Sequence, residues 1–143
     1  MYGLYGRQAS GRPDDDIMAS LLDSRHALTE DEDRPTEPPE LDRDYCDALW
    51  RGVTTEYDVL LATLAPDVDR SLAALAPIER ALLVIGAWEL THRLDIPYRV
   101  VIDEAVELAK VYGGTDGHKF VNGVLDQVAV RLRADEIRAS ARR

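Results

Sequence analysis

The chain has 143 residues, of which 45% are hydrophobic, and this suits one domain with one sizeable core. Asp and Glu outnumber Lys and Arg by 27 to 17, and the net charge of −10 argues against a generic basic nucleic-acid binder. The single cysteine excludes an internal disulfide. The longest apolar run (81–88) is too short for a membrane span, and no secretory signal is visible. We therefore expect a cytoplasmic protein.

The first part of the chain predicts a short helix followed by a linker. Residues 14–28 follow helical spacing and begin with three aspartates, where the helix dipole favours negative charge. Residues 29–40 are acidic and contain three prolines and no aromatic residue, a composition typical of a solvated linker without a partner. The segment from Asp14 to Asp44 holds 12 acidic and 3 basic residues, and so carries most of the net charge of the chain. The overall charge therefore says little about binding faces elsewhere.

Residues 41–133 are predicted to form the main helical part. Apolar residues recur with a 3.6-residue period from Leu41 to Leu64, so we expect one long helix that ends at Pro66. A short helical piece follows at 71–75.

Two prolines, Pro77 and Pro97, suit the first turns of the next two helices, where a missing N–H costs nothing. Apolar residues lie on several faces of the Pro77 helix, which predicts that it is buried nearly all round. The Pro97 helix has one apolar face and is expected to end at 113–114, where two glycines can adopt the left-handed cap conformation.

The last helix of the main part has a continuous apolar stripe, and Thr115 or Asp116 can cap its start. The stripe consists of Val121, Val124, Leu125, Val128 and Leu132. Asn122 followed by Gly123 would alone indicate a hairpin turn, but the stripe continues past both residues. We therefore expect Gly123 to mark a close approach of two helices. Residues 134–143 are polar and predict a frayed tail.

No pattern in the sequence indicates catalysis or a cofactor. Glu89 and His92 have the Glu-x-x-His spacing of carboxylate-bridged di-iron bundles, but those need the motif twice, so an ordinary surface pair is the preferred interpretation. No nucleophile elbow, phosphate-binding glycine loop or dinucleotide fingerprint is present. Cys46 is best explained as a small core residue. A carboxylate-metal bundle is kept only as a distant alternative.

Phe120, the one phenylalanine, lies beside Lys119 just outside the apolar stripe and near a helix start. An exposed ring next to a cation can stack on an unpaired base, and a helix N-terminus offers N–H groups to phosphates. From the residues alone, a ring that covers the edge of the core is the preferred interpretation.

Four strings of residues resemble the NusB family of bacterial transcription antitermination factors. They are Ile78–Leu90 (IERALLVIGAWEL), Asp95–Tyr98 (DIPY), Ile102–Lys110 (IDEAVELAK) and His118–Asp126 (HKFVNGVLD). The last string is highly specific. The resemblance implies an all-α fold, a NusB-like helical bundle of two helical subdomains in a single domain over 1–143, with 1–28 in the smaller subdomain.

NusB-like proteins are not enzymes, and the resemblance implies the same here, with neither a cofactor, a metal nor a small-molecule substrate. They pair with the ribosomal protein NusE, bind boxA RNA with it and help RNA polymerase to transcribe ribosomal RNA operons. Matched positions put Tyr5, Tyr112, Asp116, Lys119 and Phe120 on the RNA side, which reverses the preference at Phe120. Glu79 is the expected residue on the NusE side.

One departure concerns the start of the chain. The family begins with an arginine-rich segment that leads into its first helix, whereas residues 1–9 resemble only the end of that helix, as if it were truncated at Met1. Because phosphate contacts set much of the RNA affinity, we expect the natural start to lie upstream. Otherwise this member binds RNA weakly or only through its partner.

Two further interpretations stay open. The chain could be a NusB-like protein-interaction module that keeps the NusE contact, with RNA binding lost or dependent on the partner. Some ribosomal RNA cytosine methyltransferases also carry a NusB-like N-terminal domain. No methyl-donor-binding domain follows Arg131 in this sequence, which favours a stand-alone protein.

Overall fold

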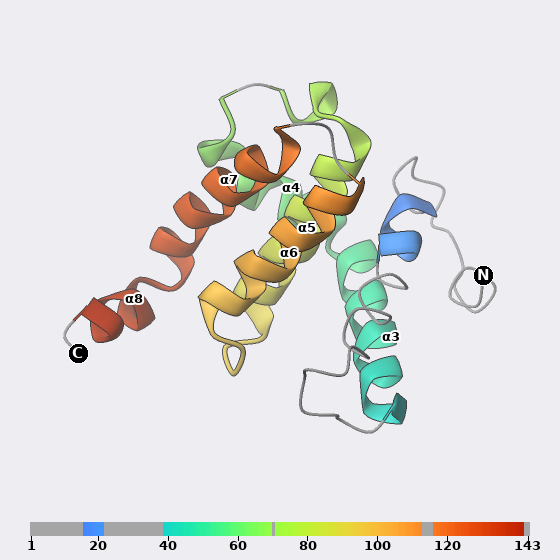
Figure 1. Cartoon of the computed structure of the whole chain (residues 1–143), viewed down its shortest axis with the longest axis horizontal. Coiled ribbons are helices and arrows are strands. Elements are labelled where there is room, and N and C mark those ends of the chain that lie inside the picture. Colours follow the sequence, from blue (N-terminus) through green and yellow to red (C-terminus); the bar gives the residue numbers. More distant parts are fainter. Residues whose placement is uncertain (1–15, 22–38, 70, 113–115, 142–143) are drawn as a thin grey trace.

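The computed structural model describes residues 16–21, 39–69, 71–112 and 116–141, and within these ranges all regular elements are helical. The prediction of an all-α fold is therefore confirmed. In the labels of Figure 1, the elements are α3 (Pro39–Thr55), α4 (Tyr57–Leu64), η1 (Ala65–Asp67), η2 (Leu72–Ala74), α5 (Pro77–His92), α6 (Tyr98–Tyr112), α7 (Gly117–Leu132) and α8 (Ala134–Ala141). Residues 16–21 are also helical.

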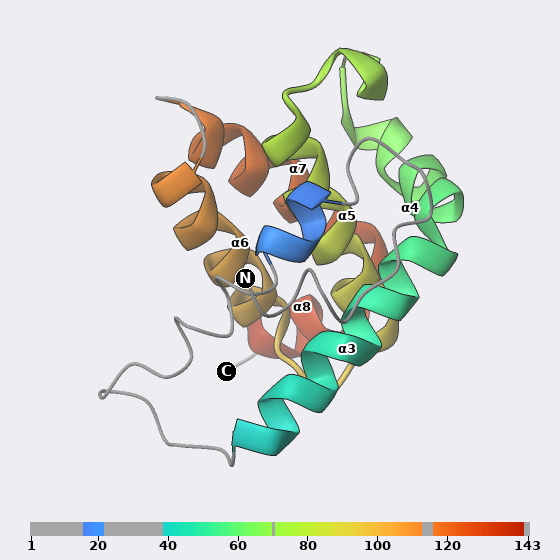
Figure 2. The ribbon, with the colours of Figure 1, turned by 90° about the vertical axis from the view of Figure 1, so that its right-hand side faces the viewer.

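Helix α5 is the centre of the bundle and contacts α3, α4, α6 and α7. Every residue from 81 to 90 is buried, which confirms that this helix is covered on all sides. Pro77 lies in its first turn, as predicted. Figure 1 shows α5, α6 and α7 running alongside one another, and Figure 2 shows α3 crossing beside α5. The residues at the start of α7 are therefore held on a packed three-helix frame.

The close helix approaches occur at glycines other than the predicted one. A Cβ added to Gly52 would lie 2.3 Å from Nε1 of Trp88, where α3 meets α5, and one added to Gly86 would lie 2.9 Å from a methyl of Leu125, where α5 meets α7. A Cβ on Gly123 would meet nothing within 4 Å. The prediction for Gly123 was wrong because its side of α7 faces outward, whereas Gly52 and Gly86 face neighbouring helices.

We expect Gly52→Ala to lower the free energy of unfolding by about 1–3 kcal/mol, since the methyl would overlap the rigid indole of Trp88. Gly123→Ala is the matched control, expected to raise the free energy of unfolding by roughly 0.5–1 kcal/mol, because alanine favours a helix and the site is open. Urea unfolding followed by circular dichroism measures both. Equal effects in the two variants would contradict the tight contact at Gly52.

The predicted long helix over 41–64 is broken at Glu56, so α3 and α4 are separate helices, and α3 begins at Pro39. The break lets the chain turn around α5, so that Tyr57, Leu60 and Leu64 are buried. Periodicity could not reveal it, since both halves are amphipathic in nearly the same register. The predicted short piece at 71–75 is present as η2, and α6 begins one residue after Pro97.

The predicted frayed tail was also wrong, because residues 134–141 form α8. Ile137 packs against the core, and the buried Arg133 stands at the junction of α7 and α8. The Arg133 guanidinium donates to the carbonyl oxygens of Leu90 (2.8 Å) and Arg93 (2.8 Å) at the end of α5. These long-range hydrogen bonds fix the polar segment 134–141 against the bundle, although its composition alone predicts a frayed end.

Candidate nucleic-acid interface

The start of α7 presents a pair of exposed, oppositely charged side chains. Asp116 stands at the N-cap position but makes no side-chain cap hydrogen bond, so the predicted capping is wrong in that respect. Its backbone oxygen accepts from the N–H groups of Lys119 (3.1 Å) and Phe120 (3.3 Å). The Asp116 carboxylate lies 3.5 Å from Nζ of Lys119, with these side chains 77% and 73% exposed. The lysine is therefore accessible and only weakly held. Thr115 lies outside the described residues.

Phe120 is half-buried, with the core on one side and an open hollow on the other. This hollow, here called the Phe120 hollow, has a volume of about 460 Å³. It is lined by Pro66, Asp67, Asp69, Lys119, Phe120, Gly123, Val124 and Gln127. The ring is neither fully exposed nor sealed inside the bundle.

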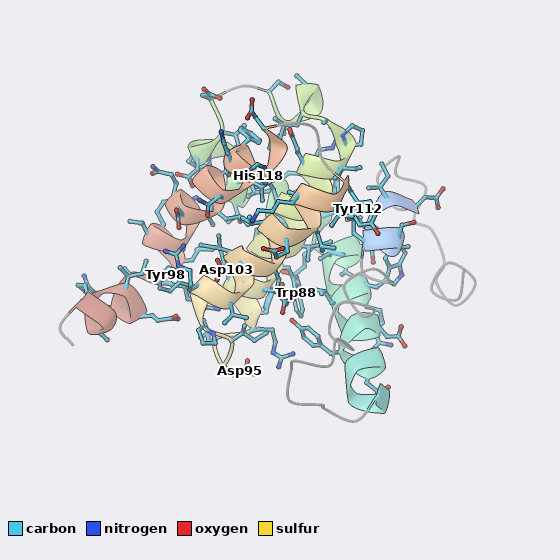
Figure 3. The ribbon with its side chains drawn as sticks, viewed as in Figure 1. Trp88, Asp95, Tyr98, Asp103, Tyr112 and His118 are labelled. Atoms are coloured by element: carbon cyan, nitrogen blue, oxygen red, sulfur yellow. The ribbon has the colours of Figure 1, made fainter. Side chains whose placement is uncertain are left out.

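Tyr112 is 46% exposed and ends α6, and Figure 3 shows it and His118 near the same end of the bundle. It does not line the Phe120 hollow. Instead it lines a second, mainly apolar hollow of about 270 Å³ with Ile17, Leu21 and Ile78. Figure 2 shows the 16–21 segment lying over α5 and α6 in this region. The structure therefore places Tyr112 on a different surface from Lys119 and Phe120.

Glu79, expected on the partner side, lies next to the start of α7. A Cβ added to Gly117 would be 3.0 Å from Oε1 of Glu79, so this carboxylate is close to the positive end of the α7 dipole. The structure thus places Glu79 against Gly117, in the first turn of α7, rather than on a distant face. Tyr5 lies outside the described residues.

Sequence reasoning missed the far wall of the Phe120 hollow, which η1 and the residues after it supply. Asp67 is held there by Arg131 of α7, whose Nε donates to its carboxylate at 3.0 Å and whose terminal nitrogen donates to the Thr63 carbonyl at 2.8 Å. Helical spacing from Phe120 points to Gly123 and Gln127 on the same face of α7. No sequence signal could have joined Asp67 and Asp69 to that face.

The Glu-x-x-His pair does not form a metal site. Glu89 is buried and accepts a hydrogen bond from the hydroxyl of Tyr45, so the interpretation as a surface pair was wrong for this residue. His92 instead lies 2.9 Å from a carboxylate oxygen of Glu56. In the part of the chain that the structure describes, no cluster of three or more His, Cys, Asp or Glu could hold a metal ion. The side chain of Cys46 is outside that part.

Over the described ranges, no helix is both long enough and apolar enough to cross a membrane.

Comparison with known proteins gives the family. The model of the NusB family matches residues 3–130. The chain belongs to the NusB family. A transcription antitermination protein NusB of Paraburkholderia phymatum is 47% identical over 141 residues, covering 99% of this chain and 90% of that relative. The protein of the same name from Paraburkholderia xenovorans is 46% identical with the same coverage.

A solved structure of NusB from T. maritima has the same fold. It superposes with a TM-score of 0.62 at 25% identity, over 82% of this chain and 91% of that one. The resemblance seen in the sequence and the predicted NusB-like helical bundle are therefore confirmed.

Proposed function

We propose that this NusB-family chain is a transcription antitermination factor that binds boxA RNA together with the ribosomal protein NusE. It would act in the antitermination complex of RNA polymerase and support transcription of ribosomal RNA. Its relatives at 46–47% identity are named transcription antitermination proteins, which supports this role. The chain works by binding two partners and not by catalysis.

The observation that carries the proposal is the half-buried ring of Phe120 at an open hollow beside the exposed Lys119. Because the core holds one side of the ring, little side-chain entropy is lost when a base stacks on the other side. The lysine can then contact a phosphate of the same strand. Tyr5 and Tyr112 remain proposed RNA contacts, and Tyr112 lies on a different surface from the Phe120 hollow.

The charge balance supports a partnership with NusE. Outside Asp14–Asp44 the chain holds 15 acidic and 14 basic residues, so it gains little sequence-independent attraction to RNA, and a docked partner would supply much of the affinity. Glu79 is proposed to face NusE, and it lies against Gly117, only two residues before Lys119. NusE bound at Glu79 would extend the proposed RNA-binding surface beyond the start of α7.

The central test is Phe120→Ala. Loss of one stacked base should weaken boxA binding about 5- to 150-fold, the equivalent of roughly 1–3 kcal/mol. Fluorescence anisotropy of labelled boxA RNA with this chain, NusE or both, at two salt concentrations, measures it. Phe120→Leu keeps an apolar side chain against the core but lacks the aromatic face, so it should also bind weakly while remaining folded.

Val130→Ala is the control on the same helix, since Val130 is 59% exposed and does not line the Phe120 hollow. It should bind boxA RNA as the wild-type chain does. Wild-type affinity in both Phe120 variants would contradict the proposed stacking.

A second candidate is an interaction module that keeps the NusE contact and has lost RNA binding or depends on NusE for it. The carboxylates of Asp67 and Asp69 in the hollow favour this candidate, since they repel phosphates. The same titration separates the two. If NusE alone binds boxA RNA as tightly as NusE with this chain, the second candidate is correct.

A further inference from the structure

We propose that Gly123 lets an unpaired nucleobase of the bound RNA lie directly against the backbone of α7, inside the Phe120 hollow. The inference rests on the proposed function. It assigns the hollow a ligand, a base rather than a phosphate, and gives Gly123 the role of a positioning residue.

The first observation is that the packing of the described residues does not require this glycine. Gly123 is exposed in the middle of α7, and an added Cβ would meet nothing within 4 Å. The other described glycines, Gly52, Gly86 and Gly117, would bring a Cβ to 3.0 Å or less from a neighbouring side chain. A glycine inside an exposed helix weakens that helix relative to alanine. An external ligand that must come close to the backbone explains why the cost is tolerated.

The second observation is where Gly123 lies. It lines the Phe120 hollow together with Phe120, three residues earlier, and Lys119, four residues earlier, so all three share one face of α7. A base stacked on the Phe120 ring would extend over Gly123. A side chain at this position would hold the base away from the helix.

The charges of the hollow favour a base over a phosphate. Asp67, whose carboxylate also pairs with Arg131, and Asp69 line one wall, and carboxylates repel a phosphate but accept hydrogen bonds from the amino groups of bases. Gln127, one turn beyond Gly123, brings an amide that can both donate and accept. Lys119 is exposed at the start of the helix, where a phosphate can stay in solvent. The backbone of the RNA would thus pass outside while one base enters.

The test compares Gly123→Ala and Gly123→Leu with the wild-type chain, each with NusE and boxA RNA. Both variants should melt at the wild-type temperature or higher, with Gly123→Ala raised by roughly 2–4 °C, because they favour the helix. Both should bind RNA more weakly. Gly123→Leu should lose about tenfold or more, which is most of one base stack. Val130→Ala, on the same helix outside the hollow, should bind as the wild type does.

The outcomes separate the inference from the function on which it rests. If wild-type chain with NusE does not bind boxA RNA more tightly than NusE alone, the proposed function itself fails. If the wild type binds and Gly123→Leu binds equally well, the function stands and the role of Gly123 is overturned. A lowered melting temperature would show that the glycine is structural. Weaker binding of NusE in the absence of RNA would assign the hollow to the protein partner, and either result overturns the inference.

Discussion

Replacing Arg133 with methionine is expected to lower the free energy of unfolding by about 3–5 kcal/mol. Arg133 is only 3% exposed, and its guanidinium donates to carbonyl oxygens at the end of α5 and to the Ile96 carbonyl at 2.9 Å. It also pairs with Glu136 of α8 at 2.6 Å, and Glu136 in turn accepts from the backbone N–H of Tyr98 at 2.8 Å. Arg133 and Glu136 together thus join α5, α6 and α8. Without it, several carbonyls at a helix end lose their donors.

Urea unfolding measures this effect, with two variants for comparison. Arg133→Lys should recover little of the free energy of unfolding that Arg133→Met loses, since an ammonium group cannot donate to several carbonyls at once as a planar guanidinium does. Arg138→Ala removes an exposed arginine that pairs with Asp135 within α8, and should change stability by less than about 0.5 kcal/mol. Similar values for Arg133→Met and Arg138→Ala would show that the buried network contributes nothing.

Leu125→Ala should lower the free energy of unfolding by about 2–5 kcal/mol, because Leu125 is fully buried and its truncation leaves a cavity between α7 and α5. Its two methyl groups lie 2.9 and 3.0 Å from the position that a Cβ on Gly86 would take. Gly86→Ala alone should therefore not raise the free energy of unfolding, since its methyl must displace Leu125. In the Leu125→Ala background the same change should recover roughly 1–2 kcal/mol by filling part of the cavity.

A double-mutant cycle over the four proteins checks this reversal. Each protein is unfolded in urea, and the coupling is the departure of the double variant from the sum of the single variants. Additive effects would mean that Gly86 and Leu125 do not share the space assigned to them.

Much of the fold followed from local signals in the sequence. Pro77 and the many-sided apolar pattern after it predicted a buried α5, and the stripe through Asn122 and Gly123 correctly predicted a continuous α7. The break at Glu56 and the helix α8 were missed for a physical reason. Both depend on contacts with distant parts of the chain, such as Arg133 with the end of α5, which periodicity does not report.

The candidate site divides in the same way. Lys119 and Phe120 were found because they stand next to each other beside an apolar stripe and in a familiar string. The acidic wall at Asp67 and Asp69 lies about fifty residues earlier in the chain and reaches them only through packing of η1 against α7. The exposure of Phe120 also depends on tertiary packing. The sequence predicts the angular position of Phe120 on the helix, but not how closely other segments pack around its ring.

The position of Glu79 against Gly117 means that α5 and the first turn of α7 are not independent in energy. A ligand that binds the Glu79 carboxylate changes the field at the very turn that orients Lys119, and by reciprocity a ligand at Lys119 changes the affinity at Glu79. Second-site suppressors of a defect at one of these residues should accordingly be found at the other.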